Sequence, residues 1–343
     1  MSRSIRKSVV TAVAIATGAA LLSACGGGAD AGGDSQLSLV AYSVPKAADG
    51  AVEKAFAKTP DGKGVTFKES YGPSGDQSRA VVGGLQADVT HFSLTPDTTR
   101  LVDEGLVDAS WDQNDRKGIL STSVVSIIVR KGNPKNITSF ADLAKPGIGI
   151  VTPNPGSSGS ARWNILAAYQ EQIANGASEA EGEAYLKKVF ANVKALPGSG
   201  RDATTAFQGG TGDVLLSYEN EAIFARQSGE DVDYVIPEKN LLIENPGAVT
   251  KKASPVARKF LDFASSAEGQ AVYAQYGFRP VASVSGVEVG QVKGANDPAN
   301  PFPQIKELFT IDKTFGGWDA VNATFFDEKD GLITKIIAES GKS

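Results

Sequence analysis

The regular alternation of short β-rich runs with amphipathic helical stretches constrains the fold of this chain more than any other feature. Runs rich in Val, Ile, Leu and Thr predict strands at 37–42, 64–70, 87–94, 123–132, 147–153 and 213–218. Apolar residues at helical spacing predict helices at 47–58, 76–86, 137–144, 161–175 and 178–193. This alternation predicts an α/β architecture with largely parallel sheets, in which ligands gather at the carboxyl ends of the strands.

The N-terminus has the composition of a secretory signal. Three basic residues within 3–7 precede an apolar run, 9–22, which is shorter than the ~20 residues that span a bilayer as a helix. The tetrapeptide Leu-Ser-Ala-Cys that ends at Cys25 resembles a bacterial lipobox, and Cys25 is the single cysteine of the chain. We therefore expect residues 1–24 to be a signal peptide and 25–36 to be a flexible tether lipidated at Cys25, with no intramolecular disulfide.

The charge and length of the remaining chain exclude several classes of protein. Removal of residues 1–24 changes the formal net charge from −5 to −8, whereas proteins that bind nucleic acid present a basic face. About 300 residues remain after the tether, which favours two domains or lobes. We expect a monomer that binds no nucleic acid, cofactor or metal and that contacts a membrane through its lipid alone.

Glycine- and serine-rich turns of one pattern lie at 71–78, 154–161 and 197–204. Each follows a short apolar run and opens a helix, so each presents the free N–H groups of a helix N-terminus and its partial charge of roughly +0.5. Taken singly, Ser74, Ser158 and Ser160 are each better explained as helix caps, worth ~1 kcal/mol each. The repetition of the pattern favours a shared site for a small anion.

Catalytic alternatives receive less support from the sequence. The turn at 71–78 lacks the lysine of a P-loop, and the turn at 154–161 lacks the G-x-S-x-G order of a hydrolase elbow. His91, the single histidine, is the one possible imidazole base of a secreted serine hydrolase, but a lone strand histidine is more often structural. A third alternative is an adhesive or structural surface lipoprotein, which binds no small anion tightly.

Three longer segments carry a more specific resemblance. They are VRKGNPKNITSFADLAKPGIGIVTPNPGSSGSARWN (129–164), GDVLLSYENEA (212–222) and LFTIDKTFGGW (308–318). In sequence and order they are similar to the prokaryotic sulfate-binding proteins, the solute receptors of sulfate/thiosulfate ABC importers. This resemblance, which covers nearly the whole chain after the tether, implies a type II periplasmic-binding-protein fold of two α/β lobes joined by a hinge. It also implies capture of sulfate outside the cytoplasmic membrane and delivery to a permease and ATPase, without chemistry by the receptor.

The resemblance also assigns roles to individual residues. The family's sulfate-binding positions fall on Ser43, Ser74, Ser158, Gly159, Ser160, Gly200 and Tyr218, with Arg201 as a support of its loop. Three positions depart from the family pattern, since Ser43 replaces an aspartate, Ser160 a glycine, and Tyr218 a tryptophan that donates through its indole N–H in the best-studied branch. A main-chain N–H survives the first two changes, whereas the phenol of Tyr218 donates with a different reach.

The identity of the anion depends on its protonation. Sulfate carries no proton at neutral pH and suits a site that contains donors alone, whereas phosphate keeps a proton and requires an acceptor as well. We therefore expect sulfate, with thiosulfate, molybdate or phosphate as alternative ligands.

The lobes implied by the resemblance are discontinuous in sequence. Residues 37–128 and 237–343 are expected to form one lobe, and residues 129–236 the other. The helix-rich stretch 253–277 has no strand partner of its own, so we expect it to pack on the first of these lobes.

Overall fold

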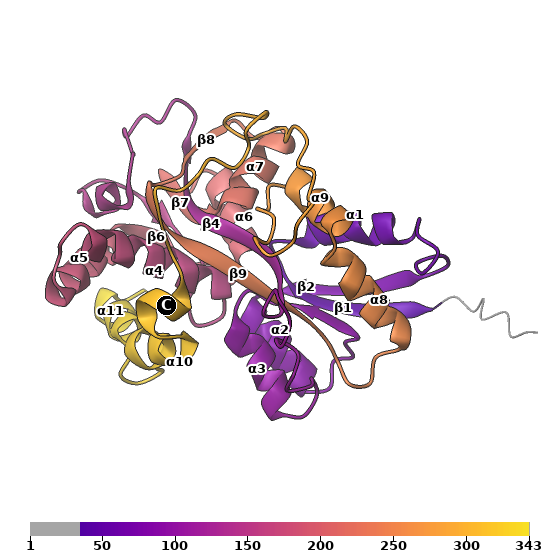
Figure 1. Ribbon diagram of the computed structural model, residues 1–343. Coiled ribbons are helices and arrows are strands. Elements are labelled where there is room, and N and C mark those ends of the chain that lie inside the picture. Colours follow the sequence, from indigo (N-terminus) through magenta and orange to yellow (C-terminus); the bar gives the residue numbers. More distant parts are fainter. Residues whose placement is uncertain (1–34, 343) are drawn as a thin grey trace, which may run out of the picture. The chain divides into compact units, whose positions relative to one another are not determined.

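Strands and helices alternate along the computed structural model, which describes residues 35–342 (Figure 1). The strands are β1 (Gln36–Tyr42), β2 (Thr66–Gly72), β3 (Val89–His91), β4 (Ile119–Arg130), β5 (Ile150–Val151), β6 (Val193–Ala195), β7 (Val214–Tyr218), β8 (Val232–Val235), β9 (Lys239–Val249) and β10 (Glu307–Phe309). The α-helices are α1 (Lys46–Phe56), α2 (Ser74–Val82), α3 (Thr95–Asp103), α4 (Gly159–Ala174), α5 (Glu179–Asn192), α6 (Gly200–Gln208), α7 (Glu219–Gln227), α8 (Pro255–Ala264), α9 (Ala267–Gln275), α10 (Trp318–Val321) and α11 (Leu332–Ser340). A 3-10 turn at Phe140–Ala144 and π turns at Ile311–Phe315 and Asn322–Phe326 complete the described elements. Each predicted strand and helix has a counterpart, so the α/β alternation is confirmed.

The strands of the described residues form one mixed sheet in the order β2-β1-β3-β9-β4-β7-β5-β6, with β10 beside β9 and β8 beside β4. Pairing is parallel among β1, β2 and β3 and among β5, β6 and β7. Strand β4 pairs antiparallel with β7, β8 and β9, and β9 also pairs antiparallel with β3. The prediction of largely parallel sheets is therefore right for each half and wrong for the strands between them.

Two long strands connect the halves of the sheet. The first half of β4 pairs with β9, whereas its second half pairs with β7 and β8. The C-terminal end of β9 pairs in turn with β3, so both strands pass from one half to the other. Two α/β lobes joined in this way form the predicted type II periplasmic-binding-protein fold. We call the lobe around β1, β2 and β3 the first lobe and the lobe around β5, β6 and β7 the second lobe.

Helices α8 and α9 pack on α1 of the first lobe, as the sequence predicts for 253–277. The ring of Phe56 in α1 lies 5.4 Å from that of Phe260 in α8, edge to face. Tyr273 in α9 donates a hydrogen bond of 2.7 Å to the buried carboxylate of Asp49 in α1. Figure 1 shows α1, α8 and α9 together on one side of this lobe, with α2 and α3 on the other side.

The last part of the chain packs on the second lobe. The indoles of Trp163 in α4 and Trp318 in α10 meet edge to face with ring centres 4.8 Å apart, and Tyr169 meets Phe325 in the same way at 5.1 Å. Lys342 donates to the carbonyl of Phe190 at the end of α5. We therefore propose that residues from about 279 onward belong to the second lobe, in place of the predicted assignment of all of 237–343 to the first.

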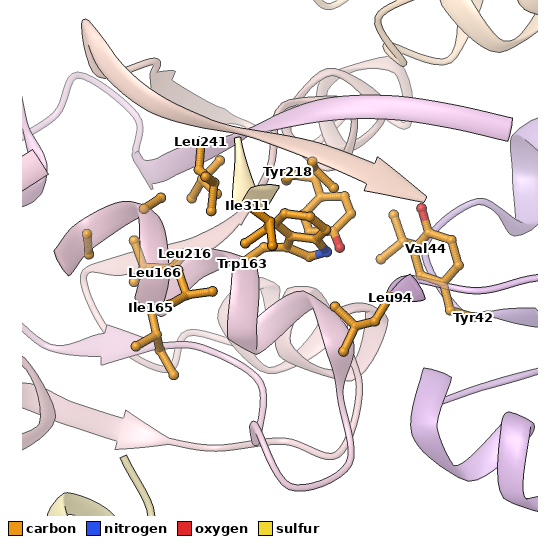
Figure 2. Close-up of a cluster of buried hydrophobic side chains, with 14 of the residues drawn as sticks. Tyr42, Val44, Leu94, Trp163, Ile165, Leu166, Leu216, Tyr218, Leu241 and Ile311 are labelled. Atoms are coloured by element: carbon orange, nitrogen blue, oxygen red, sulfur yellow. The ribbon is translucent and has the colours of Figure 1, made fainter. Parts of the chain in front are cut away.

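A buried hydrophobic cluster lies where the two lobes meet. Trp163, Tyr218 and Leu216 contribute to it from the second lobe, and Val44 and Leu94 from the first (Figure 2). The residues of this cluster are mostly apolar, so the polar groups of a ligand site would come from the turns at the nearby helix starts. Within residues 35–342, none of the helices combines the length and the apolar character needed to cross a membrane.

Candidate functional site

The predicted turns converge between the lobes. Helices α2, α4 and α6 begin at Ser74, Gly159 and Gly200, each within a predicted turn. The N–H of Gly75 in the first lobe donates to the carbonyl of Ser157 in the second at 3.3 Å, which ties the first two turns together. The N–H of Arg201 points to the hydroxyl of Ser43 at 3.4 Å, a long contact that joins α6 to the end of β1. Three helix N-termini thus face one region, as an anion site without a formal cation requires.

The turn before α4 is shaped by its asparagine. The side chain of Asn154 accepts the N–H of Gly156 at 2.8 Å, and its carbonyl accepts the N–H of Ser158 at 2.8 Å. Because the N–H of Ser158 is used within the turn, the main-chain donors that remain at the helix start are those of Gly159 and Ser160. Ser158 contributes its hydroxyl, which is buried and lies 2.8 Å from the hydroxyl of Ser160.

Gly159 and Gly200 are required by close packing between the lobes. A Cβ atom on Gly159 would lie 2.7 Å from Cβ and Oγ of Ser93 and 2.7 Å from Cγ of Leu94. A Cβ atom on Gly200 would lie 2.9 Å from both Oγ of Ser160 and a methyl group of Val44. Both positions therefore tolerate no side chain in this closed arrangement of the lobes.

The hydroxyl of Ser74 has a structural role. It donates a 2.6 Å hydrogen bond to the carboxylate of Asp97 and accepts the N–H of Ser93 at 2.9 Å. With its single hydrogen used in this way, the hydroxyl has none left for a ligand. The predicted contribution of Ser74 to an anion site therefore narrows to its main-chain N–H at the start of α2.

Tyr218 ends β7 and is completely buried. Its hydroxyl lies 2.8 Å from that of Ser93, and its carbonyl accepts the hydroxyl of Ser126 at 3.0 Å. Burial raises the pKa of Tyr218, so the phenol keeps its proton and remains a donor at neutral pH. The indole of Trp163, labelled with Tyr218 in Figure 2, bonds the carbonyl of the same Ser93 at 2.9 Å.

Arg201 is committed to a buried carboxylate. Its guanidinium donates to Glu221 at 2.8 Å and to the carbonyl of Val44 at 3.1 Å, and it lies over the ring of Phe224. Thr204 donates to the other oxygen of Glu221 at 2.9 Å. Burial raises the pKa of Glu221, and the charge of Arg201 opposes that shift. Arg201 thus neutralises a protein carboxylate and braces its loop against the first lobe, in keeping with the supporting role predicted for it.

His91 takes part in a fully buried network. Its ring nitrogens lie 3.0 Å from Asp49 and 2.9 Å from the hydroxyl of Ser121, an order that resembles a hydrolytic triad. All three side chains are buried, and Ser121 is 0% exposed, so no substrate reaches the hydroxyl. The geometry supports the structural interpretation of this histidine. Among residues 35–342, no group of three or more His, Cys, Asp or Glu side chains is arranged to hold a metal ion.

Sequence reasoning missed Ser93 and Asn245, which hold the site together. The carbonyl of Ser93 accepts the indole N–H of Trp163 at 2.9 Å and the amide of Asn245 at 3.0 Å. Asn245 also accepts the hydroxyl of Tyr42 at 2.8 Å. Ser93 lies two residues after the end of β3, so the rule that ligands gather at the carboxyl ends of strands was a signal that pointed to it.

A cleft of about 910 Å³ opens beside the site and is lined from both lobes. Ser43, Lys46 and Tyr71 contribute to it from the first lobe, and Arg201 and Phe224 from the second. Of the residues predicted for the site, Ser43 and Arg201 line this cleft, which lies between α1 and α6.

Glu53, in the wall of this cleft, gives a testable pH dependence. Burial, with repulsion from Glu69 and Asp49, raises the pKa of Glu53 to about 8, and one of its oxygens is buried without a partner. Because its folded-state pKa exceeds its unfolded value, the stabilisation is present at low pH and is lost as pH rises through about 8. We expect Glu53→Gln to flatten the fall of Tm between pH 5 and about 8.5 in ligand-free protein. Exposed Glu328→Gln is the control, and an unchanged pH profile in Glu53→Gln would contradict the assignment.

Two lobes that close on convergent helix N-termini define a solute-binding protein that encloses its ligand. The sequence profile of the family described as bacterial extracellular solute-binding protein matches residues 37–279. A sulfate-binding protein of Synechococcus elongatus is 38% identical over 96% of both chains. A thiosulfate-binding protein of Pseudomonas aeruginosa is 35% identical over 79% of this chain and 82% of its own. The solved structure of the sulfate-binding protein SubI from Mycobacterium tuberculosis is 43% identical, with a TM-score of 0.78, and the match covers 85% of this chain and 100% of that one.

The chain belongs to the bacterial extracellular solute-binding proteins, and within them to the sulfate-binding family. The predicted family, the fold class and the extracytoplasmic location are thereby confirmed. These relatives are binding proteins, so the chain is not an enzyme and the serine-hydrolase alternative is wrong.

Proposed function

We propose that the protein captures sulfate between its lobes and delivers it to the permease and ATPase of an ABC importer. The convergence of α2, α4 and α6 on one region, with Arg201 already paired to Glu221, is the observation that carries this proposal. Main-chain N–H groups of Gly159, Ser160 and Gly200, with the hydroxyl of Ser158, are the proposed donors. Ser43 and Ser74, through their main-chain N–H groups, are further proposed donors, and Tyr218 completes the proposed set of site residues.

The partners of the nearby carboxylates favour sulfate over phosphate. One oxygen of Asp97 accepts the hydroxyl of Ser74 and the other accepts Arg100. Both oxygens of Glu221 are also occupied, by Arg201 and Thr204. A proton on phosphate would therefore meet donors rather than a free carboxylate, at a cost of ~1–3 kcal/mol. The name of the Pseudomonas relative makes thiosulfate the second candidate.

Calorimetric titration of the delipidated protein tests the ligand. We expect one site per chain for sulfate and about ten-fold or greater weakening for phosphate. Thiosulfate and molybdate are the remaining titrants, since they share the charge and the tetrahedral shape of sulfate. Failure of all four anions to bind would overturn the proposed function and favour a structural surface lipoprotein. Light scattering during the same experiment tests whether the protein is a monomer.

We further propose that the protein is held at the membrane by a lipid on Cys25, which lies outside the described residues. Each buried CH₂ of a lipid chain contributes ~0.8 kcal/mol to membrane binding. We expect Cys25→Ser to move the protein from the membrane fraction to the soluble extracytoplasmic fraction, as measured by fractionation and immunoblotting. Ser23→Thr, which keeps the cysteine, is the matched control. Continued retention of Cys25→Ser at the membrane would contradict a lipid anchor.

A further inference from the structure

The main chain of Ser93 is fixed from both lobes. Its N–H donates to the hydroxyl of Ser74 in the first lobe at 2.9 Å, and its carbonyl accepts the indole of Trp163 in the second lobe at 2.9 Å. Asn245 in the connecting strand β9 donates to the same carbonyl at 3.0 Å. The residue is 0% exposed. None of these bonds uses the hydroxyl of Ser93, so the main chain of this residue is held in place without it.

That hydroxyl lies against the start of α4. The close approach of Ser93 Oγ to the position of a Cβ on Gly159, 2.7 Å, places the oxygen beside the first residue of the helix. Gly159 and Ser160 carry the free N–H groups of this helix start. Ser93 Oγ therefore borders the region that the proposed anion occupies.

The hydroxyls of Ser93 and Tyr218 form a pair with one hydrogen to spare. They lie 2.8 Å apart, and a single bond between them uses one of their two hydrogens. The side-chain oxygen of Asn245 accepts the hydroxyl of Tyr42 at 2.8 Å, and the hydroxyl of Ser121 lies 3.4 Å from the same oxygen, so its two lone pairs already have partners. Asn245 also bonds the phenol of Tyr218 in the sense that lowers its pKa, so its amide N–H donates to the phenol oxygen and the phenol hydrogen serves Ser93 Oγ. In this arrangement no hydrogen bond of the described residues uses the hydroxyl hydrogen of Ser93. A buried donor left in this way indicates an acceptor that comes with the ligand.

We propose that Ser93 is a further anion-binding residue, which donates its hydroxyl hydrogen to the bound sulfate while Tyr218 donates to Ser93 Oγ. This inference rests on the proposed function, since it requires an anion at the start of α4. Ser93 is the member of the pair beside Gly159, so it makes the contact. Tyr218 acts as a positioning residue, because its bond fixes the direction of the Ser93 hydroxyl and polarises it.

Sulfate titration of four variants tests this order of donors. We expect Ser93→Ala to weaken binding about tenfold or more, since a hydrogen bond to a desolvated charge is lost. Tyr218→Phe keeps the Ser93 donor and is expected to weaken binding about threefold, through lost orientation and polarisation. The double variant should bind about as weakly as Ser93→Ala alone, because Tyr218 acts through Ser93. Ser123→Ala, which removes a buried hydroxyl that has no partner, is the control and should bind as the wild type does.

The outcomes separate this inference from the proposed function. Wild-type affinity in Ser93→Ala overturns the inference while the receptor function stands, and a larger loss in Tyr218→Phe than in Ser93→Ala shows that Tyr218 is the direct donor. Additive losses in the double variant also contradict the relay. Absence of sulfate binding by the wild type overturns both the function and the inference. Thermal unfolding of each ligand-free variant distinguishes a loss of affinity from a loss of folded protein.

Discussion

Gly159→Ala is expected to abolish tight sulfate binding without unfolding the protein. The added methyl carbon would lie 2.7 Å from Cβ of Ser93 and from Cγ of Leu94, and Ser93 cannot retreat because its main chain is held on both sides. Such overpacking costs ~1–3 kcal/mol, which corresponds to about five- to 150-fold in affinity. We expect a loss of about 100-fold, near the upper end of this range. Gly159 belongs to the second lobe and its clash partners to the first, so the added methyl group directly opposes closure of the lobes.

Small-angle scattering and calorimetry measure the two parts of this prediction. Wild-type protein should become more compact on addition of sulfate, because both lobes contribute donors to one dianion. Gly159→Ala should remain expanded at the same sulfate concentration and keep its unfolding temperature when ligand-free. Gly198→Ala is a matched control, since a Cβ atom there meets nothing within 4 Å in the neighbouring turn. Compaction and wild-type affinity in Gly159→Ala would contradict the closed packing described above.

The sequence predicted the elements that obey a regular pattern and missed those whose polar residues find distant partners. Strand β1 follows an apolar pattern, and its predicted bounds of 37–42 differ by one residue from Gln36–Tyr42. Strand β9 was missed because Asn240, Asn245 and Pro246 interrupt its apolar run. Asn240 bonds both main-chain groups of Val125 across the sheet, which makes a buried polar residue acceptable there. Local periodicity carries no information on such a long-range partner.

The same reasoning explains which part of the site the sequence revealed. Ser158, Gly159 and Gly200 lie at helix starts, and glycine- and serine-rich turns are a local signal. The pairing of Ser93 with Tyr218 joins residues separated by 125 positions, so no window along the chain displays it. The sequence assigned Ser74 to the anion site without restricting its role to the main-chain N–H. Its hydroxyl bonds Asp97 of another helix, and a local pattern does not reveal such a partner.

The arrangement of charge around the site explains how an acidic protein can hold a dianion. Arg201, the cation in the turn at 197–204, is neutralised by Glu221, and Asp97 is bonded by Ser74 and Arg100. The charges of Arg201 and Asp97 are therefore balanced within the protein, before a ligand arrives. The field that attracts the anion then comes from main-chain dipoles at three helix starts, which require no reorganisation on binding.

Ser158→Ala removes the side-chain donor of this set and is expected to weaken sulfate binding by ~1.5–3 kcal/mol, or about ten- to 150-fold. Ser160→Gly is the matched variant in the same turn, and we expect a loss of less than about threefold, because the main-chain N–H remains and Ser158 still donates. The hydroxyls of the two serines lie 2.8 Å apart, so one of their two hydrogens serves the pair and the other serves the anion.

This pairing makes the double variant the decisive measurement for the turn. In Ser158→Ala the hydroxyl of Ser160 is freed from its partner, and a partial replacement by Ser160 would place the loss near tenfold. Ser158→Ala with Ser160→Gly removes both hydroxyls, so its affinity should fall below the product of the two single effects. Calorimetry at one fixed ionic strength measures all three variants without a change in screening. A loss in Ser160→Gly as large as that in Ser158→Ala would contradict the assignment of Ser158 as the side-chain donor.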